Sequence, residues 1–227
     1  MEVIVLAGGM GTRLKDAVPD LPKPMAPIKN KPFLEYLLNW LSQCPAIEQI
    51  ILATGYKSET IIEYFDRSFK RIPVVYANEV EPLGTGGAIS NALTACDSQH
   101  VLIVNGDTYF PIDIMHFQEF HERIKKPVSI ALKKMYRFDR YGTVEIEEDT
   151  IMKFNEKKSC EEGLINGGIY LLDKNWFGMQ KHPDKFSFEK DILEHYVSQQ
   201  LLSGKVFDDV FVDIGIPEDY IKAASIV

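Results

Sequence analysis

Short apolar runs alternate with helix-like segments through the first half of this chain of 227 residues. The apolar runs are rich in Val, Ile and Leu and contain few polar positions, which is typical of strands buried on both faces of a parallel sheet. We expect strands at Glu2–Ala7, Gln49–Thr54, Pro73–Tyr76 and His100–Asn105, with helices between them at Pro32–Cys44, Ser58–Phe65 and Gly86–Ala95. This order predicts βα units and therefore an α/β fold with a parallel sheet flanked by helices.

The pattern changes in the second half of the chain. Further strand-like runs joined by turns lie at Val128–Lys133, Gly142–Glu147, Ile151–Glu156 and Ile165–Leu171. Ser187 is a candidate cap for a helix that runs to about Gln199, Val206–Val212 is a predicted strand, and Pro217 begins a terminal helix. Because no linker rich in Pro, Gly or Ser divides the chain, we expect a single domain whose two halves share one mixed sheet.

Composition narrows the classes of protein to which this chain can belong. Its net charge is −8 and its basic residues are scattered, which argues against binding to DNA or RNA. Its longest apolar runs, such as Val101–Val104, fall far short of the roughly 18 residues that indicate a membrane span. The first residues are too few and too acidic for a signal peptide, so we expect a cytoplasmic protein with three reduced cysteines.

A glycine-rich loop follows the first strand, with the sequence Leu6-Ala7-Gly8-Gly9-Met10-Gly11-Thr12-Arg13-Leu14. Its three glycines let the backbone approach a ligand and present N–H groups to phosphate oxygens, and Arg13 adds a permanently charged fork. The loop is not a P-loop, because Gly-Thr-Arg stands where that motif needs Gly-Lys-Ser/Thr. It is not a dinucleotide-binding GxGxxG fingerprint, because Leu14 takes the place of the third glycine.

Lys23 lies in the proline-rich stretch after this loop, within Leu21-Pro22-Lys23-Pro24-Met25. A lone lysine is most often a solvated surface residue. The flanking prolines restrict the backbone, however, and could direct the ammonium group back toward the glycine loop. We therefore interpret Lys23 as a second candidate phosphate ligand beside Arg13.

Two aspartates end apolar runs that lie far apart in the sequence. Asp107 follows Asn105-Gly106, and Asp213 stands in Phe211-Val212-Asp213-Ile214-Gly215-Ile216-Pro217. Each is at a predicted strand terminus, so both could face one crevice, where Mg²⁺ favours a few carboxylates together with phosphate oxygens and water. A turn-forming aspartate is the structural alternative, and we interpret Asp208 and Asp209 as solvated loop charges.

The motif GGMGTRL, followed by PKPM, resembles the signature of the sugar-phosphate nucleotidyltransferases, and the similarity extends nearly from end to end. It implies a Rossmann-like nucleotidyltransferase fold with a mixed, mostly parallel central sheet in one domain, residues 1–227. About residues 1–110 would be the nucleotide-binding half and about 111–227 the sugar-phosphate-binding half. The implied reaction is Mg²⁺-dependent condensation of a nucleoside triphosphate with a sugar 1-phosphate, by an enzyme that forms a homodimer.

The resemblance also assigns roles to the residues singled out above. The positions matching Arg13, Lys23 and Asp107 are catalytic in this family, and those matching Asp107 and Asp213 bind the metal ion. The sugar phosphate is already ionised near pH 7, since its second pKa is about 6, so the expected reaction needs no general base. Catalysis would then consist of positioning and charge neutralisation.

A second glycine motif, Glu81-Pro82-Leu83-Gly84-Thr85-Gly86-Gly87-Ala88, is similar to the PLGT[AG]G stretch of guanylyltransferases. The structural alternative is a glycine-rich helix entrance. Relatives that use pyrimidines often carry a larger side chain at the position of Gly87, so glycine favours a purine and GTP is the expected donor. Glu79 or Glu81 could accept from the guanine amino group, and the sequence does not choose between them. The expected nucleotide-binding residues are Leu6, Ala7, Gly8, Gly9, Gly11, Thr12, Arg13, Lys23, Glu79, Glu81, Gly84, Thr85 and Gly87.

Motifs in the second half resemble the sugar-phosphate site of the family. By that resemblance, Glu156 accepts from sugar hydroxyls, Lys157 neutralises the sugar phosphate, and Asn166 lines the ring. Taken singly, Glu156 and Lys157 could be a surface ion pair worth about 0–1 kcal/mol, and the glycines could mark turns. The expected sugar-phosphate-binding residues are Arg140, Tyr141, Gly142, Glu156, Lys157, Asn166 and Gly167.

Within the family, the stretches LGTGGAI, FDRYGTV, LINGGIYLL and FVDIGIPEDY are similar to guanylyltransferases that act on a heptose 1-phosphate for bacterial surface polysaccharide. The alternatives are a mannose 1-phosphate guanylyltransferase and a short uridylyltransferase. An alternative of another class is a non-catalytic nucleotide-sugar sensor, against which the intact set of Arg13, Lys23, Asp107, Lys157 and Asp213 argues.

Overall fold

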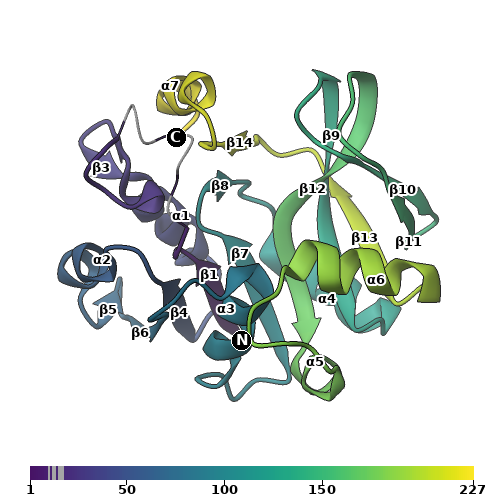
Figure 1. Ribbon diagram of the computed structural model, residues 1–227, viewed down its shortest axis with the longest axis horizontal. Helices are drawn as coiled ribbons and strands as arrows, with labels where there is room; N and C mark the ends of the chain where they lie inside the picture. Colours follow the sequence, from purple (N-terminus) through teal and green to yellow (C-terminus); the bar gives the residue numbers. More distant parts are fainter. Residues whose placement is uncertain (10, 12–13, 15–17) are drawn as a thin grey trace.

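The computed structural model describes residues 1–9, 11, 14 and 18–227, and a single large sheet forms its centre (Figure 1). In the described residues this sheet has ten strands in the order β10-β11-β13-β9-β12-β7-β1-β4-β6-β5. The strands are β1 (Glu2–Leu6), β4 (Gln49–Thr54), β5 (Ser68–Phe69), β6 (Ile72–Asn78), β7 (His100–Asn105), β9 (Val128–Phe138), β10 (Thr143–Glu147), β11 (Thr150–Phe154), β12 (Cys160–Asp173) and β13 (Leu202–Phe207). Two short pairs lie outside it, β2 (Pro27–Ile28) with β3 (Lys31–Pro32), and β8 (Thr108–Tyr109) with β14 (Val212–Asp213).

The directions of the strands confirm the predicted mixed sheet. The pairs β1–β4, β1–β7, β4–β6 and β9–β13 are parallel, whereas β12 runs antiparallel to both of its neighbours, β7 and β9. Among the seven described strands from β13 to β6, β12 is therefore the only reversed one. The first half of the chain forms the parallel block, and β12 joins it to the second half, so the fold is one continuous α/β unit.

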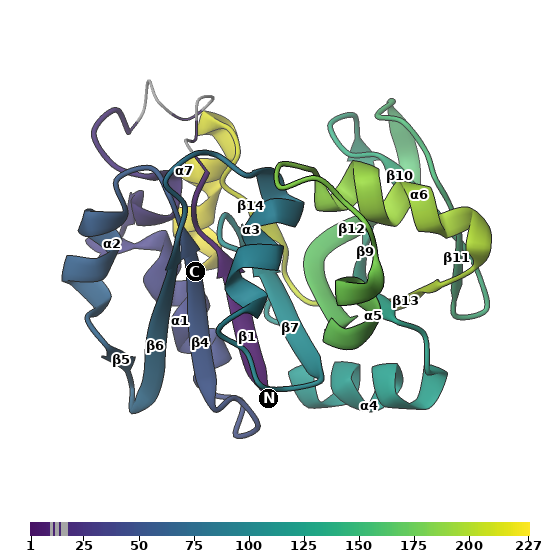
Figure 2. The same cartoon turned by 60° about the horizontal axis from the view of Figure 1, so that its bottom comes forward.

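Helices cover both faces of the sheet (Figure 2). The helices are α1 (Phe33–Leu41), α2 (Ser58–Phe65), α3 (Gly84–Leu93), α4 (Ile114–Ile124), α5 (Lys174–Met179), α6 (Glu194–Tyr196) and α7 (Pro217–Ile226), with a 3-10 turn η1 (Lys23–Met25), a π-helical segment η2 (Phe188–Leu193) and a second 3-10 turn η3 (Val197–Gln199). One hydrophobic cluster packs α1, α2 and α4 against one face, and a second packs α3, α5 and η2 against the other. None of the helices in the described part of the chain combines the length and apolar character that a bilayer crossing requires.

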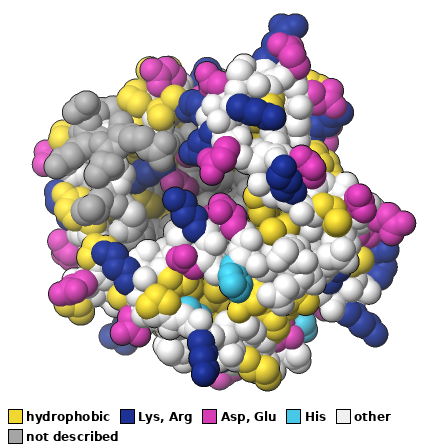
Figure 3. Space-filling view, turned by 45° about the vertical axis from the view of Figure 1, so that its right-hand side comes forward, with side chains coloured by type: hydrophobic (Ala, Val, Ile, Leu, Met, Phe, Trp, Pro, Cys, Tyr) yellow, Lys and Arg dark blue, Asp and Glu magenta, His cyan; other side chains and the backbone are white. Residues whose placement is uncertain are grey.

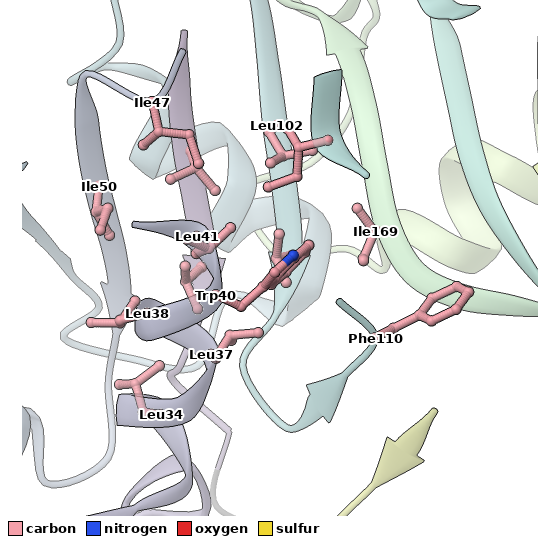
Figure 4. Packing of buried hydrophobic residues seen from close by; sticks show 14 of the residues in the cluster. Leu34, Leu37, Leu38, Trp40, Leu41, Ile47, Ile50, Leu102, Phe110 and Ile169 are labelled. Atoms are coloured by element: carbon pink, nitrogen blue, oxygen red, sulfur yellow. The ribbon is translucent and has the colours of Figure 1, made fainter. Parts of the chain in front are cut away.

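The alternation of side chains along the parallel strands explains why the apolar runs are unbroken. In β1, Val3 and Val5 belong to one cluster and Ile4 to the other, so successive residues are buried on opposite faces. On the first face, Trp40 of α1 lies over Leu102 of β7, and its indole nitrogen donates to the carbonyl of Ile112 (Figure 4). The buried indole thereby gains its hydrogen-bond partner, which favours a fixed position for α1 against the sheet.

Two predictions about secondary structure fail. The strand predicted at Val206–Val212 is in fact two, because β13 begins earlier, at Leu202, and ends at Phe207, whereas β14 pairs with β8. The exposed Asp208 and Asp209 separate them. Helices α4 and α5 were not predicted, although Ile114, Phe117 and Phe120 follow the spacing of an amphipathic helix.

A buried polar network ties β7, α4, β9 and β13 together. The ring of His121 bonds His100 through Nε2 at 2.9 Å and Ser129 through Nδ1 at 2.7 Å, and Ser129 bonds Ser203 at 2.8 Å. His121 is 1% exposed, and burial, helped by the neighbouring His100, lowers its pKa to about 4. The imidazole therefore folds in its neutral form.

Acid should destabilise the fold through His121. The pKa of His121 falls from 6.5 to about 4 on folding. At pH values between these two, His121 is therefore protonated in the unfolded chain and neutral in the folded chain. Stability should thus fall as pH drops through this window, by roughly 3 kcal/mol in all. Urea unfolding at pH 7, 5 and 4 should show this loss in the wild type and a shallower one in His121→Gln. The exposed control His195→Gln should keep the wild-type slope; equal slopes in all three proteins would remove His121 as the cause.

Candidate active site

A cavity of about 500 Å³ lies at the carboxyl ends of four neighbouring parallel strands. Its lining residues follow β1, β4, β6 and β7, which end at Leu6, Thr54, Asn78 and Asn105. Ligands in open α/β sheets bind at this edge, where successive connections diverge. The residues that line the cavity are Leu6, Gly8, Gly9, Ala53, Gly55, Tyr56, Glu79, Val80, Glu81, Pro82, Gly84, Thr85, Ala88, Asn105 and Asp107.

The glycine loop reaches from this cavity to Lys23. Gly11 has φ +59°, and a Cβ atom built on it would lie 2.7 Å from the Cβ of Lys23. Glycine is thus required there by both the backbone conformation and the close approach of Lys23. Lys23 lies in η1, with a proline on either side, and is only 9% exposed. Thr12 and Arg13, two expected nucleotide ligands, lie outside the described residues.

Lys23 lies between the two aspartates predicted to share a crevice. Its ammonium nitrogen is 2.5 Å from Oδ2 of Asp107 and 3.7 Å from Oδ1 of Asp213. The short pairing of β8 with β14 aligns Asp213 with Thr108, and the amide of Ile214 donates to the carbonyl of Asp107. The structure therefore brings together two carboxylates from positions 107 and 213 around one cation.

This donor set fits a magnesium ion. Asp107 and Asp213 would hold the ion, since Mg²⁺ favours a small number of carboxylates together with water and phosphate oxygens. No cluster of three or more His, Cys, Asp or Glu side chains occurs in the described part of the chain. A metal ion at Asp107 and Asp213 would accordingly depend on ligands from substrate, and Lys23 would have to yield part of its contact.

The structure distinguishes the two glutamates that the sequence left open. Glu79 is partly buried in the cavity, and its Oε2 accepts from the amide of Leu83 at 2.8 Å. Burial raises the pKa of this carboxyl, and the Leu83 amide counteracts only part of that rise. Glu81 also lines the cavity but is exposed. Glu79 is therefore the glutamate with a fixed orientation.

The glycines of the second motif serve the packing of α3 against the segment before η2. A Cβ on Gly84 would lie 2.4 Å from the carbonyl oxygen of Phe186, and one on Gly87 would lie 2.4 Å from that of Asp184. The space at Gly87, interpreted above as room for a purine, is thus filled by the protein itself. The hydroxyl of Thr85 donates to Glu189 at 2.6 Å, which fixes α3 to η2.

Alanine at Gly84 should be strongly destabilising. Its φ of +74° disfavours any side chain, and the new Cβ would meet backbone rather than a flexible side chain. We expect Gly84→Ala to lower the free energy of unfolding by about 2–4 kcal/mol, measured by urea denaturation. Gly178→Ala in α5 is the matched control, because nothing lies within 4 Å of its Cβ position. A Gly84→Ala protein as stable as the control would show that the α3–η2 contact is not rigid.

The expected sugar-phosphate residues fall into two adjacent groups. Gly142 packs against Asn155, because a Cβ atom built on Gly142 would lie 2.4 Å from the carbonyl oxygen of Asn155. The loop at 141–142 therefore lies beside the segment that carries Glu156. Glu156 and Lys157 are both exposed and have no hydrogen-bond partner among the described residues. Both are therefore available to a ligand.

The second group lies next to the cavity. Asn166 bonds the hydroxyl of Tyr170 at 3.0 Å and accepts from the amide of Gly168, so its amide group is fixed. A Cβ on Gly168 would lie 2.8 Å from the side chain of Asn105, which lines the cavity, and Gly167 packs under Phe110. On the face shown in Figure 3, acidic and basic side chains surround a hollow near its centre.

Tyr141 and Arg140 connect this region to the aspartates. The ring of Tyr141 meets that of Phe211, two positions before Asp213, with centroids 5.9 Å apart. Burial raises the pKa of Tyr141, and the charge of Asp213 adds to the rise. Arg140, an expected ligand of phosphate or sugar hydroxyls, instead bonds Asp219 of α7.

Sequence reasoning missed seven residues that line the cavity, namely Ala53, Gly55, Tyr56, Val80, Pro82, Ala88 and Asn105. Tyr56, Val80 and Asn105 are three of them, and Val80 is 97% exposed. Each of these three stands at or within two residues of the end of a parallel strand, and that position is the signal that could have identified them.

Comparison with known proteins supports an assignment over the whole chain. The Nucleotidyl transferase family matches residues 2–227. D-glycero-α-D-manno-heptose 1-phosphate guanylyltransferase from Aneurinibacillus thermoaerophilus is 47% identical over 223 residues, which are 98% of this chain and 96% of the relative. The protein of the same name from Campylobacter jejuni is also 47% identical, over 221 residues and 97% of each chain.

The fold matches solved structures equally well. The crystal structure of HddC from Yersinia pseudotuberculosis superposes with a TM-score of 0.88 at 38% identity, covering 99% of this chain and 98% of that one. The structure of HddC complexed with GMP-PN gives a TM-score of 0.86 at 37% identity. Both halves of the sheet are therefore included in the similarity.

Proposed function

Because the chain belongs to the nucleotidyl transferase family, we propose that it transfers a guanylyl group from GTP to D-glycero-α-D-manno-heptose 1-phosphate and releases pyrophosphate. The observation that carries the reaction class is the convergence of Lys23, Asp107 and Asp213 beside a cavity at the ends of parallel strands. The choice of GTP and heptose phosphate rests on the two relatives that share 47% of their residues with almost the whole chain. The GDP-heptose would serve surface polysaccharide synthesis.

The nucleophile in this reaction needs no activation by the protein. With a second pKa of about 6, the sugar phosphate is largely a dianion at pH 7. One of its oxygens forms a bond to the α-phosphorus of GTP, the bond from that phosphorus to the bridging oxygen breaks, and pyrophosphate leaves with the electron pair.

The main obstacle to the reaction is the electrostatic repulsion between the sugar phosphate and the triphosphate. The site supplies cationic and hydrogen-bonding groups that reduce this repulsion. Lys23 would neutralise charge on the triphosphate, since its ammonium group is held at the edge of the cavity. Lys157 is exposed and available for the incoming sugar phosphate, and Glu156 beside it for sugar hydroxyls. Arg13 would add a charge on the triphosphate, as the sequence predicts.

Asp107 and Asp213 would hold the magnesium ion. When bound, that ion supplies further charge neutralisation for the reacting phosphates. The role of the chain is to fix the two carboxylates, which it does through the pairing of β8 with β14 and through the amide of Gly215, 2.7 Å from Oδ1 of Asp213. The phosphates would then be placed by the glycine loop rather than by the metal ligands alone.

For the base, we propose that Glu79 accepts from the N1–H and amino groups of guanine. Its orientation is fixed by Leu83, whereas Glu81 is exposed. For the setting of the reaction, we propose the cytoplasm, where nucleoside triphosphates are available. A homodimer stays a prediction, which sedimentation equilibrium would decide.

Pyrophosphate release tests the proposal directly. GTP, UTP, dTTP, ATP and CTP would each be combined with heptose, mannose and glucose 1-phosphates in the presence of Mg²⁺. Turnover with GTP and the heptose phosphate alone is the expected result. Turnover with another pair would keep the reaction class and replace the substrates. Nucleotide binding without turnover by any pair would favour a nucleotide-sugar sensor.

A further inference from the structure

The ion pair between Arg140 and Asp219 joins two parts of the molecule that are 79 positions apart in the chain. Arg140 lies in the loop between β9 and β10, and Asp219 in the first turn of α7. In Figure 1, α7 and β9 both lie in the upper part of the picture, with β14 between them. The guanidinium donates from Nη2 to Oδ2 of Asp219, so it reaches from the β9–β10 loop to the C-terminal helix.

Burial makes this pair more than a surface contact. Asp219 is 8% exposed, and a buried carboxylate is costly unless a cation compensates it. Its other cationic neighbour, Lys222, is 3.5 Å away with a side chain that is 69% exposed, so Arg140 provides most of the compensation. Burial acts against the charge of Arg140, but the hydrogen bond and charge of Asp219 raise its pKa above the ordinary value.

A second contact of the same loop runs through aromatic rings to the segment before β14. The guanidinium of Arg140 lies over the ring of Tyr141, 5.6 Å from its centroid. Tyr141 in turn meets the edge of Phe211, with ring centroids 5.9 Å apart. Phe211 precedes Asp213 by two positions, so the loop is held to the segment that carries a proposed metal ligand.

Helix α7 is itself anchored to the segments around Lys23. Ala223 of α7 belongs to a hydrophobic cluster with Leu14, Ala26 and Ile28, and the hydroxyl of Tyr220 donates to the carbonyl of Pro27. The helix therefore contacts the end of the glycine loop, the strand after Lys23 and, through Asp219, the sugar-binding loop.

We infer that Arg140 is a positioning residue whose ion pair with Asp219 fastens the Tyr141–Gly142 backbone beside Asp213 before substrate arrives. This inference rests on the proposed function, because it takes Tyr141 and Gly142 to be residues that bind the sugar 1-phosphate. As a direct phosphate ligand, Arg140 would have to share its guanidinium between that phosphate and the buried carboxylate of Asp219. The clamp makes the acceptor site preformed, which lowers the cost of ordering the loop on binding.

A double-mutant cycle tests the clamp. Arg140→Ala, Asp219→Ala and the double variant should each raise the KM for the sugar 1-phosphate by about tenfold, with no additive effect in the double variant. The Kd for GTP should stay within about twofold of the wild type, since the nucleotide cavity does not include either residue. Glu218→Ala is the matched control: it removes an exposed acid from the same helical turn and should leave the KM unchanged.

Two results would overturn the clamp. An unchanged or lowered KM in Asp219→Ala would show that Arg140 is a substrate ligand that Asp219 merely restrains. Additive losses in the double variant would show that the two side chains act independently. If the wild type turns over another sugar 1-phosphate, the cycle applies to that substrate.

If the wild type turns over none, the proposed function fails, and the clamp is judged in the free protein. Hydrogen exchange of the amides at 139–142 should then be faster in Arg140→Ala and in Asp219→Ala than in Glu218→Ala. Equal exchange in all three variants would remove the clamp as well.

Discussion

Replacing Asp107 with asparagine should reduce turnover by at least about 1000-fold while the protein stays folded. Asparagine has the same shape as aspartate and can still accept the hydrogen bond from the Thr108 hydroxyl. It lacks the negative charge of the carboxylate, whose Oδ2 lies 2.5 Å from the Lys23 ammonium nitrogen. In the proposed reaction this carboxylate is one of two that hold the metal ion. Asp213→Asn should have an effect of the same order, because the two carboxylates converge on one cation.

Pyrophosphate release at saturating GTP and heptose 1-phosphate is the primary measurement, and binding of Mn²⁺ in the presence of a non-hydrolysable GTP analogue is the second. Both should be lost in Asp107→Asn and kept in Asp209→Asn, whose carboxylate is exposed in the loop between β13 and β14. Unchanged Mn²⁺ binding with lost turnover would assign Asp107 to the orientation of Lys23 alone. Normal turnover would exclude it from the mechanism altogether.

The structure explains how Lys23 can be buried and still have the catalytic role proposed for it. Two carboxylates around its ammonium group offset the cost of removing that charge from water. In the proposed reaction, Asp107 and Asp213 would hold a metal ion in place of the ammonium group, and Lys23 would bind phosphate oxygens of the triphosphate. The net charge of the chain is −8. Binding of a triphosphate is compatible with this charge, because the charges close to the site, rather than the total, determine whether an anion is attracted to it.

Much of the site was predictable because parallel strands leave a sequence signature. The four strands that end at the cavity are unbroken apolar runs, and residues following such runs must meet at one edge of the sheet. The backbone at Lys23 does pass close to Gly11 of the glycine loop, as the proline-rich stretch suggested, whereas its ammonium group bonds Asp107. These features depend on local sequence and on a topology that the alternation of elements determines.

The contacts that were missed depend on packing between distant segments. Gly84 and Gly87 meet the backbone at Phe186 and Asp184, about a hundred positions later, and no local pattern indicates such a neighbour. Arg140 carries a charge suited to a phosphate, yet its partner is a buried aspartate in the last helix. Residue type therefore identifies what a side chain can bind, whereas tertiary structure decides what it does bind.

The choice of base should depend on one carboxylate. Guanine presents two donors side by side, its N1–H and its amino group, whereas adenine has an acceptor at N1. Glu79 has one oxygen fixed by the amide of Leu83, and its other oxygen, Oε1, lies 3.2 Å from a Cβ built on Gly8 at the start of the glycine loop. An ionised carboxylate in this position can accept hydrogen bonds from both donors of guanine, and it has no N–H or O–H group that would face those donors.

Glu79→Gln should therefore lower kcat/KM for GTP by about 10- to 100-fold, since one acceptor becomes a donor that faces guanine. The ratio of kcat/KM for GTP to that for ITP, which lacks the amino group, should fall toward one. Because burial raises the pKa of Glu79, the wild-type ratio should also decrease as the pH is lowered, and at a higher pH than an ordinary glutamate would impose. Glu81→Gln, with its exposed side chain, should preserve the ratio at every pH. The opposite pattern, a ratio lost in Glu81→Gln and kept in Glu79→Gln, would transfer recognition of the base to Glu81, and a ratio kept in both would leave it to backbone groups.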